Sequence, residues 1–530
     1  MNPYLIGVIV SIIIYMVVGN LVGRSVKDVD DYYVSGRNAG TLLIAGTLIA
    51  SMMSTSSFIG DTAWTYDGFM GSMLIINLGT CAGYVLGPLL YGRFVRRSQV
   101  VTMPEFFGKR FDSKTMHTVA GITAFIVMIA YLVAVTKGTS LLMMSLTGLS
   151  KEICLLLTGV CFITFSCYSG SKGVIVTDTM MFLVFLGATL LAAPFLFDAI
   201  GGLNDMAVNV INNPDTPADV LSWHGPLEGS TLLDNVGYAI AVGALWICAI
   251  MVSPWQAGRA MMAKDEHIGI RAGGVAAIAT VFLMTLLYIM GVSMNVLDAN
   301  ITPSEDVMIV ISMSVVPTIV GVIMLTGVMS AGLSSASTFL SLCAFSATSD
   351  IVPYEFKSDK QQLRISRIIM LAVSIVAMAL AYMDLAVLRV ISWFAAGAVA
   401  SGWTVVGLGA VWSKKLTARG AVWSMAGGFA ACMIATILSK TGIVPLPAWI
   451  EPFYIGFPVS LLGAILGSMG QTPTANEVAY REKLHVVPAS EKERSLFVVD
   501  RRYGYIMIAA GILATVLLLV LWALPVNSVT

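Results

Sequence analysis

The chain has 530 residues, of which 57% are hydrophobic and 11% charged, and its formal net charge at pH 7 is zero. Soluble domains carry about a quarter charged residues, so the composition excludes an ordinary soluble protein. The zero net charge argues against nucleic-acid binding. Apolar stretches of about 18 residues or more recur from end to end, which predicts an all-α polytopic membrane protein.

Fourteen membrane spans are predicted from this pattern. The first lacks a basic leading region and a small-residue cleavage site, so we expect a retained helix rather than a signal peptide. In chain order the predicted spans cover residues 4–22, 41–66, 70–92, 116–146, 151–168, 173–199, 235–257, 272–296, 316–346, 364–383, 387–412, 417–439, 449–469 and 503–525.

Lys and Arg are concentrated in alternate loops. The loops 93–114 and 470–502 are rich in both, whereas the long segment 200–234 contains neither. The positive-inside rule then places the basic loops in the cytoplasm and both termini outside. The predicted location is the inner (cytoplasmic) membrane of a bacterium.

The chain shows no sign of enzyme chemistry. It has no P-loop of the form G-x-x-x-x-G-K-[ST] and no nucleophile elbow, so we expect no enzyme activity. The seven cysteines all fall in apolar stretches without metal-ligand spacing, which is typical of core residues. Any transport must therefore draw on an ion gradient or on the gradient of the solute itself.

A run of small polar residues interrupts the ninth predicted span. Between Ala331 and Thr338 the sequence reads AGLSSAST, and residues 331, 334, 335 and 338 share one face of a helix. Hydroxyl and carbonyl oxygens on a buried face suit a hard cation such as Na⁺. Small residues also allow close packing of membrane helices, so this run alone leaves both interpretations open.

Two other spans are interrupted near their middle. The second contains Gly46, Ser51 and the sequence STSSFIG over residues 54–60, followed directly by Asp61. This density of Gly and Ser favours a locally unwound helix whose free carbonyls face a cavity. The seventh contains Pro254, which removes a helix hydrogen bond and predicts a kink. Two interrupted helices five spans apart indicate an inverted-repeat transporter with its site at the membrane midplane.

Ionisable residues within spans are costly and are therefore candidates for function. Asp178 follows Thr177 early in the sixth span, where an interfacial carboxylate is the alternative. Lys137 lies deep in the fourth span, too far inside for easy snorkelling. We expect a buried partner for it, which is either a structural carboxylate or carbonyl, or an anionic group of a solute.

Several stretches together resemble the sodium:solute symporter family, whose members include bacterial sugar, proline, pantothenate and sialic acid carriers. The matching stretches are DYYVSGR at 31–37, SSFIG at 56–60, TMPEFFGKRF at 102–111, TD at 177–178, SPWQAGR at 253–259 and the run 331–338. The resemblance covers about residues 4–440. It implies one transmembrane domain over 1–530, with an extra helix at 4–22, a leucine-transporter-type core at 41–412 built from two inverted five-helix repeats, and three further helices at 417–525.

The resemblance also implies two Na⁺ sites. The first would use the carbonyls of Ala50, Met53 and Ala331 with the hydroxyls of Ser334 and Ser335. The second would use Asp178, Ser337 and Thr338, and its carboxylate would offset one of two nearby positive charges. We therefore expect two Na⁺ per cycle as coupling ions.

The solute cavity is less well defined by the resemblance. Candidate lining residues are Ser54, Ser56, Ser57, Asn77, Lys137 and Trp246. Sugar-carrying relatives have acidic and amide groups where this chain has serines, which makes a sugar less favoured. Lys137, if it faces the cavity, would pair with a solute carboxylate.

The sequence thus predicts a Na⁺-coupled symporter that imports a small, carboxylate-bearing organic solute by alternating access. One alternative is symport of an amine or zwitterion, with Asp61 as the charge partner. Another is a solute sensor that does not transport. The expected partners are the solute, Na⁺ and the lipid bilayer, with no nucleic acid and no obligate protein partner.

Overall fold

The computed structural model describes residues 2–23, 34–217, 219–227, 230–351, 358–384, 388–447 and 449–529, so the first residues of the 31–37 motif lie outside it. Within these ranges, eleven helices are long and apolar enough to cross a membrane, and Thr41–Met52 and Phe453–Ser468 are shorter apolar helices. The chain is an integral membrane protein. The count of fourteen spans stays a prediction.

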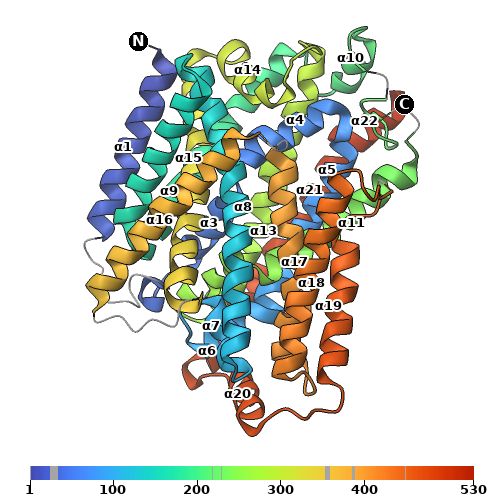
Figure 1. Cartoon of the computed structure of the whole chain (residues 1–530). Helices are drawn as coiled ribbons and strands as arrows, with labels where there is room; N and C mark the ends of the chain where they lie inside the picture. Colours follow the sequence, from blue (N-terminus) through green and yellow to red (C-terminus); the bar gives the residue numbers. More distant parts are fainter. Residues whose placement is uncertain are drawn as a thin grey trace.

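The helices form one upright bundle with both chain ends at the same end of it (Figure 1). Most of them are nearly parallel or antiparallel to the long direction of the bundle. In chain order they are α1 (Pro3–Gly23), α3 (Thr41–Met52), α4 (Thr62–Trp64), α5 (Met70–Gly87), α6 (Arg93–Ser98), α7 (Met103–Arg110), α8 (Lys114–Thr147), α9 (Lys151–Ala199), α10 (Met206–Asn212), α11 (Leu232–Val252), α12 (Pro254–Ala257), α13 (Glu266–Ser293), α14 (Val307–Val310), α15 (Thr318–Phe345), α16 (Asp359–Tyr382), α17 (Leu388–Trp412), α18 (Ala418–Lys440), α19 (Phe453–Ser468), α20 (Ala475–His485), α21 (Arg494–Leu518) and α22 (Leu524–Val529).

The long helix α9 makes two passes through the bundle. The Lys151 ammonium donates to the carbonyl of Tyr382 at the end of α16 (3.2 Å), and Arg367 near the start of α16 donates to the carbonyl of Cys167 (3.2 Å). The first part of α9 is therefore antiparallel to α16. The end of α16 and the helix that directly follows α9, α10, both lie at the upper end of the bundle in Figure 1. Because α9 starts and finishes at that end, its chain turns back on itself.

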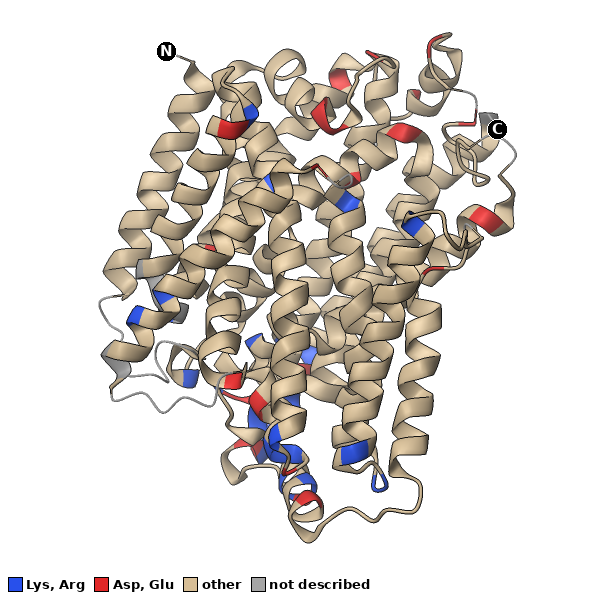
Figure 2. Cartoon of the chain, in the orientation of Figure 1, with Lys and Arg blue, Asp and Glu red and all other residues tan. Residues whose placement is uncertain are grey.

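Charge is distributed unevenly along the bundle. Lys and Arg gather at the end opposite both termini, which we call the basic end, whereas Asp and Glu predominate at the other, the acidic end (Figure 2). This separation agrees with the alternation of basic loops in the sequence. Under the positive-inside rule the basic end faces the cytoplasm, and this orientation stays a prediction.

The segment 475–500, which we call the C-terminal strap, crosses the basic end. Arg97 on α6 donates to the Glu266 carboxylate on α13 (2.7 Å) and to a main-chain carbonyl of α20 (2.9 Å). Arg110 on α7 donates to the carbonyl of Ala410 on α17 (2.6 Å) and to another carbonyl of α20 (3.1 Å). The strap thus contacts both α6 and α7 at the basic end.

The contact of α5 with α11 depends on a glycine. A Cβ atom at Gly79 would lie 2.7 Å from the Cα of Gly243, whereas one at Gly187 on α9 would meet nothing within 4 Å. We expect Gly79→Leu to destabilise the fold by about 1–3 kcal/mol, because the added atoms overpack a backbone contact. The apparent melting temperature of the purified protein should fall for Gly79→Leu and stay unchanged for Gly187→Leu. Equal melting temperatures would contradict the close packing.

Candidate functional site

The second predicted span is broken, as the sequence predicts. Helix α3 ends at Met52, and Met53 has extended backbone angles (φ −70°, ψ 112°). Helical structure resumes beyond Ser54 and includes the turn Ser56–Asp61. A helix end leaves its last carbonyls without amide partners, so this break frees main-chain oxygens inside the protein.

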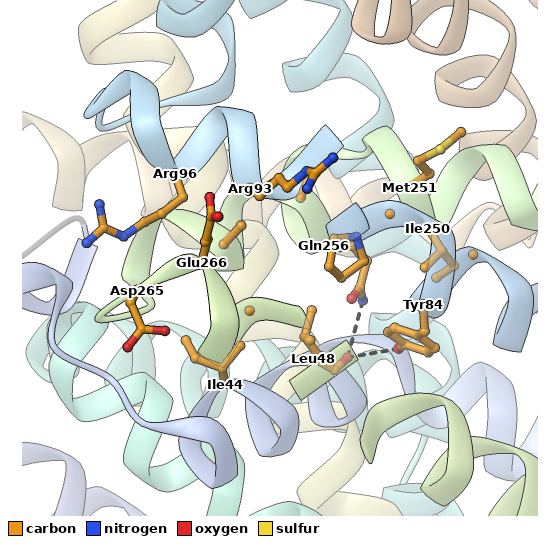
Figure 3. A pocket seen from close by; sticks show the side chains of 17 residues that line it. Ile44, Leu48, Tyr84, Arg93, Arg96, Ile250, Met251, Gln256, Asp265 and Glu266 are labelled. Atoms are coloured by element: carbon orange, nitrogen blue, oxygen red, sulfur yellow. Dashed lines mark hydrogen bonds between the residues drawn. The ribbon is translucent and has the colours of Figure 1, made fainter. Parts of the chain in front are cut away.

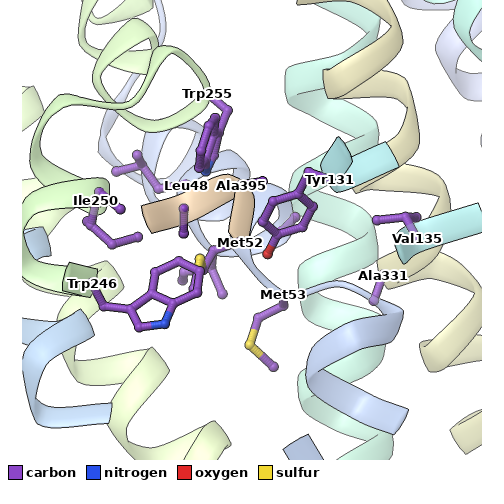
Figure 4. Close-up of a cluster of buried hydrophobic side chains, with 14 of the residues drawn as sticks. Leu48, Met52, Met53, Tyr131, Val135, Trp246, Ile250, Trp255, Ala331 and Ala395 are labelled. Atoms are coloured by element: carbon purple, nitrogen blue, oxygen red, sulfur yellow. The ribbon is translucent and has the colours of Figure 1, made fainter. Parts of the chain in front are cut away.

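A second break lies in the seventh predicted span. Helix α11 ends at Val252, Ser253 is extended (φ −61°, ψ 148°), and α12 begins at Pro254. The expected interruption at this proline is therefore confirmed. Figure 4 shows Trp246 and Trp255, which flank this break, in the same buried cluster as Met52 and Met53 of the first.

The serine run reaches the first break. It lies within α15, and Ser334, Ser335 and Ser337 are each 0% exposed. The Ser335 hydroxyl donates to the carbonyl of Met53 (3.3 Å). A Cβ at Gly332 would lie 2.6 Å from the Thr139 hydroxyl oxygen, so this glycine lets α15 approach α8 closely. The run therefore combines the two roles considered above: close packing, and an oxygen-lined face at the break.

Asp178 joins three segments in the protein interior. Its carboxylate accepts hydrogen bonds from Thr47 on α3 and from Ser334 on α15, each 2.6 Å long. The Arg259 guanidinium lies 3.6 Å from the same carboxylate. Asp178 is 0% exposed, which excludes the alternative of a solvated interfacial carboxylate.

Arg259 is a site residue that the sequence interpretation did not assign. Its guanidinium donates to the Thr338 hydroxyl (2.6 Å) and lies beside the Asp178 carboxylate. Arg259 therefore bridges Thr338 and Asp178. Ser337 instead donates to the main-chain carbonyl of Ser334 (2.9 Å). The sequence signals for Arg259 are its place at the end of the family-matching stretch SPWQAGR, close behind a proline, and its apolar neighbours Ala-Met-Met.

The candidate solute residues divide into two groups, and the first surrounds the breaks. Ser54, Ser56, Ser57 and Trp246 are all buried. Buried polar atoms without a hydrogen bond are costly and rare. Within the described residues several such atoms belong to segments at or against the two breaks: the hydroxyls of Ser56, Thr139 and Ser253, the Trp255 indole nitrogen and the Gln256 amide oxygen.

The other two candidates face elsewhere. The Asn77 amide donates weakly to Val281 (3.5 Å) and Thr285 (3.4 Å) on α13. Lys137 forms an ion pair with Asp384, whose side chain is half-exposed. This ammonium group holds the pKa of the Asp384 carboxyl below its usual range. A solute role for Lys137 stays a prediction that requires this pair to open.

A small cavity of about 40 Å³ lies between the first break and the basic end (Figure 3). The side chains of Gln256 and Tyr84 converge at its inner end on the Leu48 carbonyl, at 3.3 and 3.1 Å. Arg93 and Arg96 line its other end. The Leu48 carbonyl is thus already hydrogen-bonded.

Comparison with known proteins gives a consistent result. The model of the sodium:solute symporter family matches residues 32–428. The sodium/pantothenate symporter of Haemophilus influenzae is 25% identical, covering 82% of this chain and 91% of the relative. The sodium/proline symporter of Salmonella typhimurium is 24% identical, covering 89% and 94%.

Solved structures show the same fold. A Na⁺-coupled sialic acid symporter in a substrate-bound outward-open state superposes with a TM-score of 0.72 at 17% identity, covering 88% of this chain and 97% of that one. Mhp1, a nucleobase-cation-symport-1 family transporter, superposes with a TM-score of 0.50 at 13% identity, covering 87% and 100%. Both neighbours are transporters, and the likeness at these identities shows the fold. With a family match that spans most of its length, the chain belongs to the sodium:solute symporter family.

Proposed function

We propose that this protein is a Na⁺-coupled symporter that imports a small, carboxylate-bearing organic solute by alternating access. The observation that carries the proposal is the contact between the Ser335 hydroxyl and the Met53 carbonyl at the break in α3. Two neutral oxygens from different helices already meet there, in a site from which solvent is excluded. The protein would act in the inner membrane of a bacterium, with its basic end in the cytoplasm.

The first Na⁺ would bind between α3 and α15. The proposed ligands are the carbonyls of Ala50, Met53 and Ala331 and the hydroxyls of Ser334 and Ser335. Neutral oxygens of this kind suit a hard monovalent cation. On binding, the Ser335 hydroxyl would turn its proton away from the Met53 carbonyl, so that lone pairs of both oxygens face the ion and α15 is fixed against α3.

The second Na⁺ would bind at Asp178, Ser337 and Thr338. In the structure Arg259 supplies the positive charge beside Asp178 and holds Thr338. A Na⁺ at this position would therefore have to displace the guanidinium from the Thr338 hydroxyl. Two Na⁺ per cycle follow from the two sites.

A carboxylate on the solute is supported by the relatives. Proline, pantothenate and sialic acid, which their names give as solutes, all carry one. The proposed cavity is lined by Ser54, Ser56, Ser57 and Trp246 at the breaks, and Asn77 and Lys137 would have to leave their present partners to reach it.

A zwitterionic or amine solute is a second candidate, because Asp61 is buried just beyond the broken segment. Its electrostatic neighbours include Arg389 and Tyr131. A carboxylate in this position could pair with an ammonium group of the solute. The solute's carboxylate and ammonium would then be recognised at different depths.

Uptake into proteoliposomes tests the proposal. Radiolabelled proline, pantothenate and sialic acid should be offered with an inward Na⁺ gradient and, in parallel, with K⁺ in its place. We expect accumulation of at least one of them only with the Na⁺ gradient, and its loss when a Na⁺ ionophore is added. Binding without accumulation would instead favour a non-transporting sensor.

A further inference from the structure

A second cavity, which we call the outer cavity, lies on the acidic side of the first break. Its volume is about 240 Å³, below the ~300–1,000 Å³ of pockets for drug-sized ligands, so it fits a small solute. It shares no residue with the proposed Na⁺ ligands. Its aromatic and charged lining residues are Trp64, Tyr238, Arg389, Trp393, Lys440 and Glu451.

Arg389 is the unusual member of this lining. It is 3% exposed, yet within the described residues its Nε and Nη1 atoms have no hydrogen-bond partner. Its guanidinium lies against the Trp64 ring and 4.2 Å from the centre of the Trp393 ring, which fixes its plane. A buried guanidinium with free N–H groups is costly unless an acceptor is supplied. A carboxylate, with two oxygens in one plane, matches the paired donors on one edge of a guanidinium.

Acidic groups lie around Arg389, and Lys440 lines the cavity as the neighbour of Glu451. Asp61, Asp67 and Glu451 are electrostatic neighbours of Arg389, but in the part of the chain described none forms an ion pair with it. Glu451 lines the cavity itself, and Tyr238 stacks on Trp393 with ring centres 6.1 Å apart. Acidic groups and aromatic faces together attract an ammonium group. A ligand that satisfies both halves of the cavity is a zwitterion.

We propose that the outer cavity is a Na⁺-independent binding site for small zwitterions. Arg389 binds the carboxylate, and Glu451 with the aromatic walls binds the ammonium group. The site lies next to the segment that carries Asp61, since a Cβ at Gly60 would lie 3.7 Å from the backbone nitrogen of Arg389. A solute held there is positioned to pass to the breaks. Only this last step rests on the proposed function.

Saturation-transfer NMR on the purified full chain in K⁺ buffer without Na⁺ tests the site. The ligands offered are glycine, L-proline and glycine betaine, with acetate and methylammonium as the two separate halves. We expect at least one zwitterion to bind at least tenfold more tightly than either half. Arg389→Gln and Glu451→Gln should each weaken that binding by tenfold or more, and Arg389→Lys should weaken it less than Arg389→Gln.

Arg419→Gln is the matched control, because Arg419 also lies in the first turn of a helix over a tryptophan ring, that of Trp423. It should leave binding unchanged. If Arg389→Gln does not fold, Glu451→Gln and Arg389→Lys still decide the question. Absence of zwitterion binding in K⁺, equal binding of acetate, or binding unaffected by the variants would each overturn the inference.

The two proposals fail in different ways. Loss of Na⁺-driven uptake with this binding intact would refute symport alone. Uptake that is driven by Na⁺ in a protein with no zwitterion binding in K⁺ would refute the outer site alone.

Discussion

Replacing Ser335 with alanine is expected to raise the Na⁺ concentration for half-maximal uptake at least tenfold, equivalent to about 1.4 kcal/mol or more of Na⁺ binding. The variant removes one of five proposed oxygens and the only hydroxyl seen in contact with the Met53 carbonyl among the described residues. Because the lost group is small and the helix face is otherwise preserved, folding should be little affected. Initial uptake rates in proteoliposomes over a range of inward Na⁺ gradients measure the effect.

Ser330→Ala is the matched control for this prediction. Ser330 is also buried on α15, but its hydroxyl faces α1, where it bonds to the Tyr15 hydroxyl (2.8 Å). Its loss should leave the Na⁺ dependence unchanged. If the uptake rate depends on the Na⁺ concentration in the same way for Ser335→Ala and the parent protein, the proposed first Na⁺ site between α3 and α15 is wrong.

Asp178→Asn is expected to lower the number of coupled Na⁺ from two to one. The Hill coefficient for Na⁺ should fall from about 2 toward about 1, since one site is lost. The same variant leaves Arg259 buried without its carboxylate, and breaking a buried pair costs about 3–5 kcal/mol. A drop in melting temperature should therefore accompany the change in stoichiometry.

The double variant Asp178→Asn/Arg259→Gln separates these two effects. It removes the unpaired guanidinium, so the melting temperature should recover while the stoichiometry does not. Arg259→Gln alone keeps the carboxylate and should retain two Na⁺. An unchanged ratio of Na⁺ to solute flux in the stable double variant would contradict the second site.

The breaks in the helices are determined by the local sequence. The hydroxyls and glycines around Ser54 weaken one helix at that point, and Pro254 cannot donate the hydrogen bond that would continue another. Both signals act within a few residues, so the sequence alone suffices to predict them.

Contacts between distant segments could not be predicted in the same way. Helical spacing shows that Ser334 and Ser337 belong to the same run, but the rotation of α15 against α9 decides which of them meets Asp178, and it is Ser334. Arg259 reaches Asp178 only because the kinked segment after α11 folds beneath it. Lys137 pairs with Asp384, which is distant in the sequence. The position of the lysine within its span therefore could not identify its partner.

The C-terminal strap is expected to affect the rate of transport rather than the affinity for the solute. Its main chain accepts hydrogen bonds from arginines of α6 and α7 at the basic end. Bonds to charged donors are worth about 1.5–3 kcal/mol each. An opening toward the cytoplasm must either break them or carry the strap along. Under the proposed alternating access, the strap would raise the free-energy barrier to that opening and lower the frequency at which the solute is released.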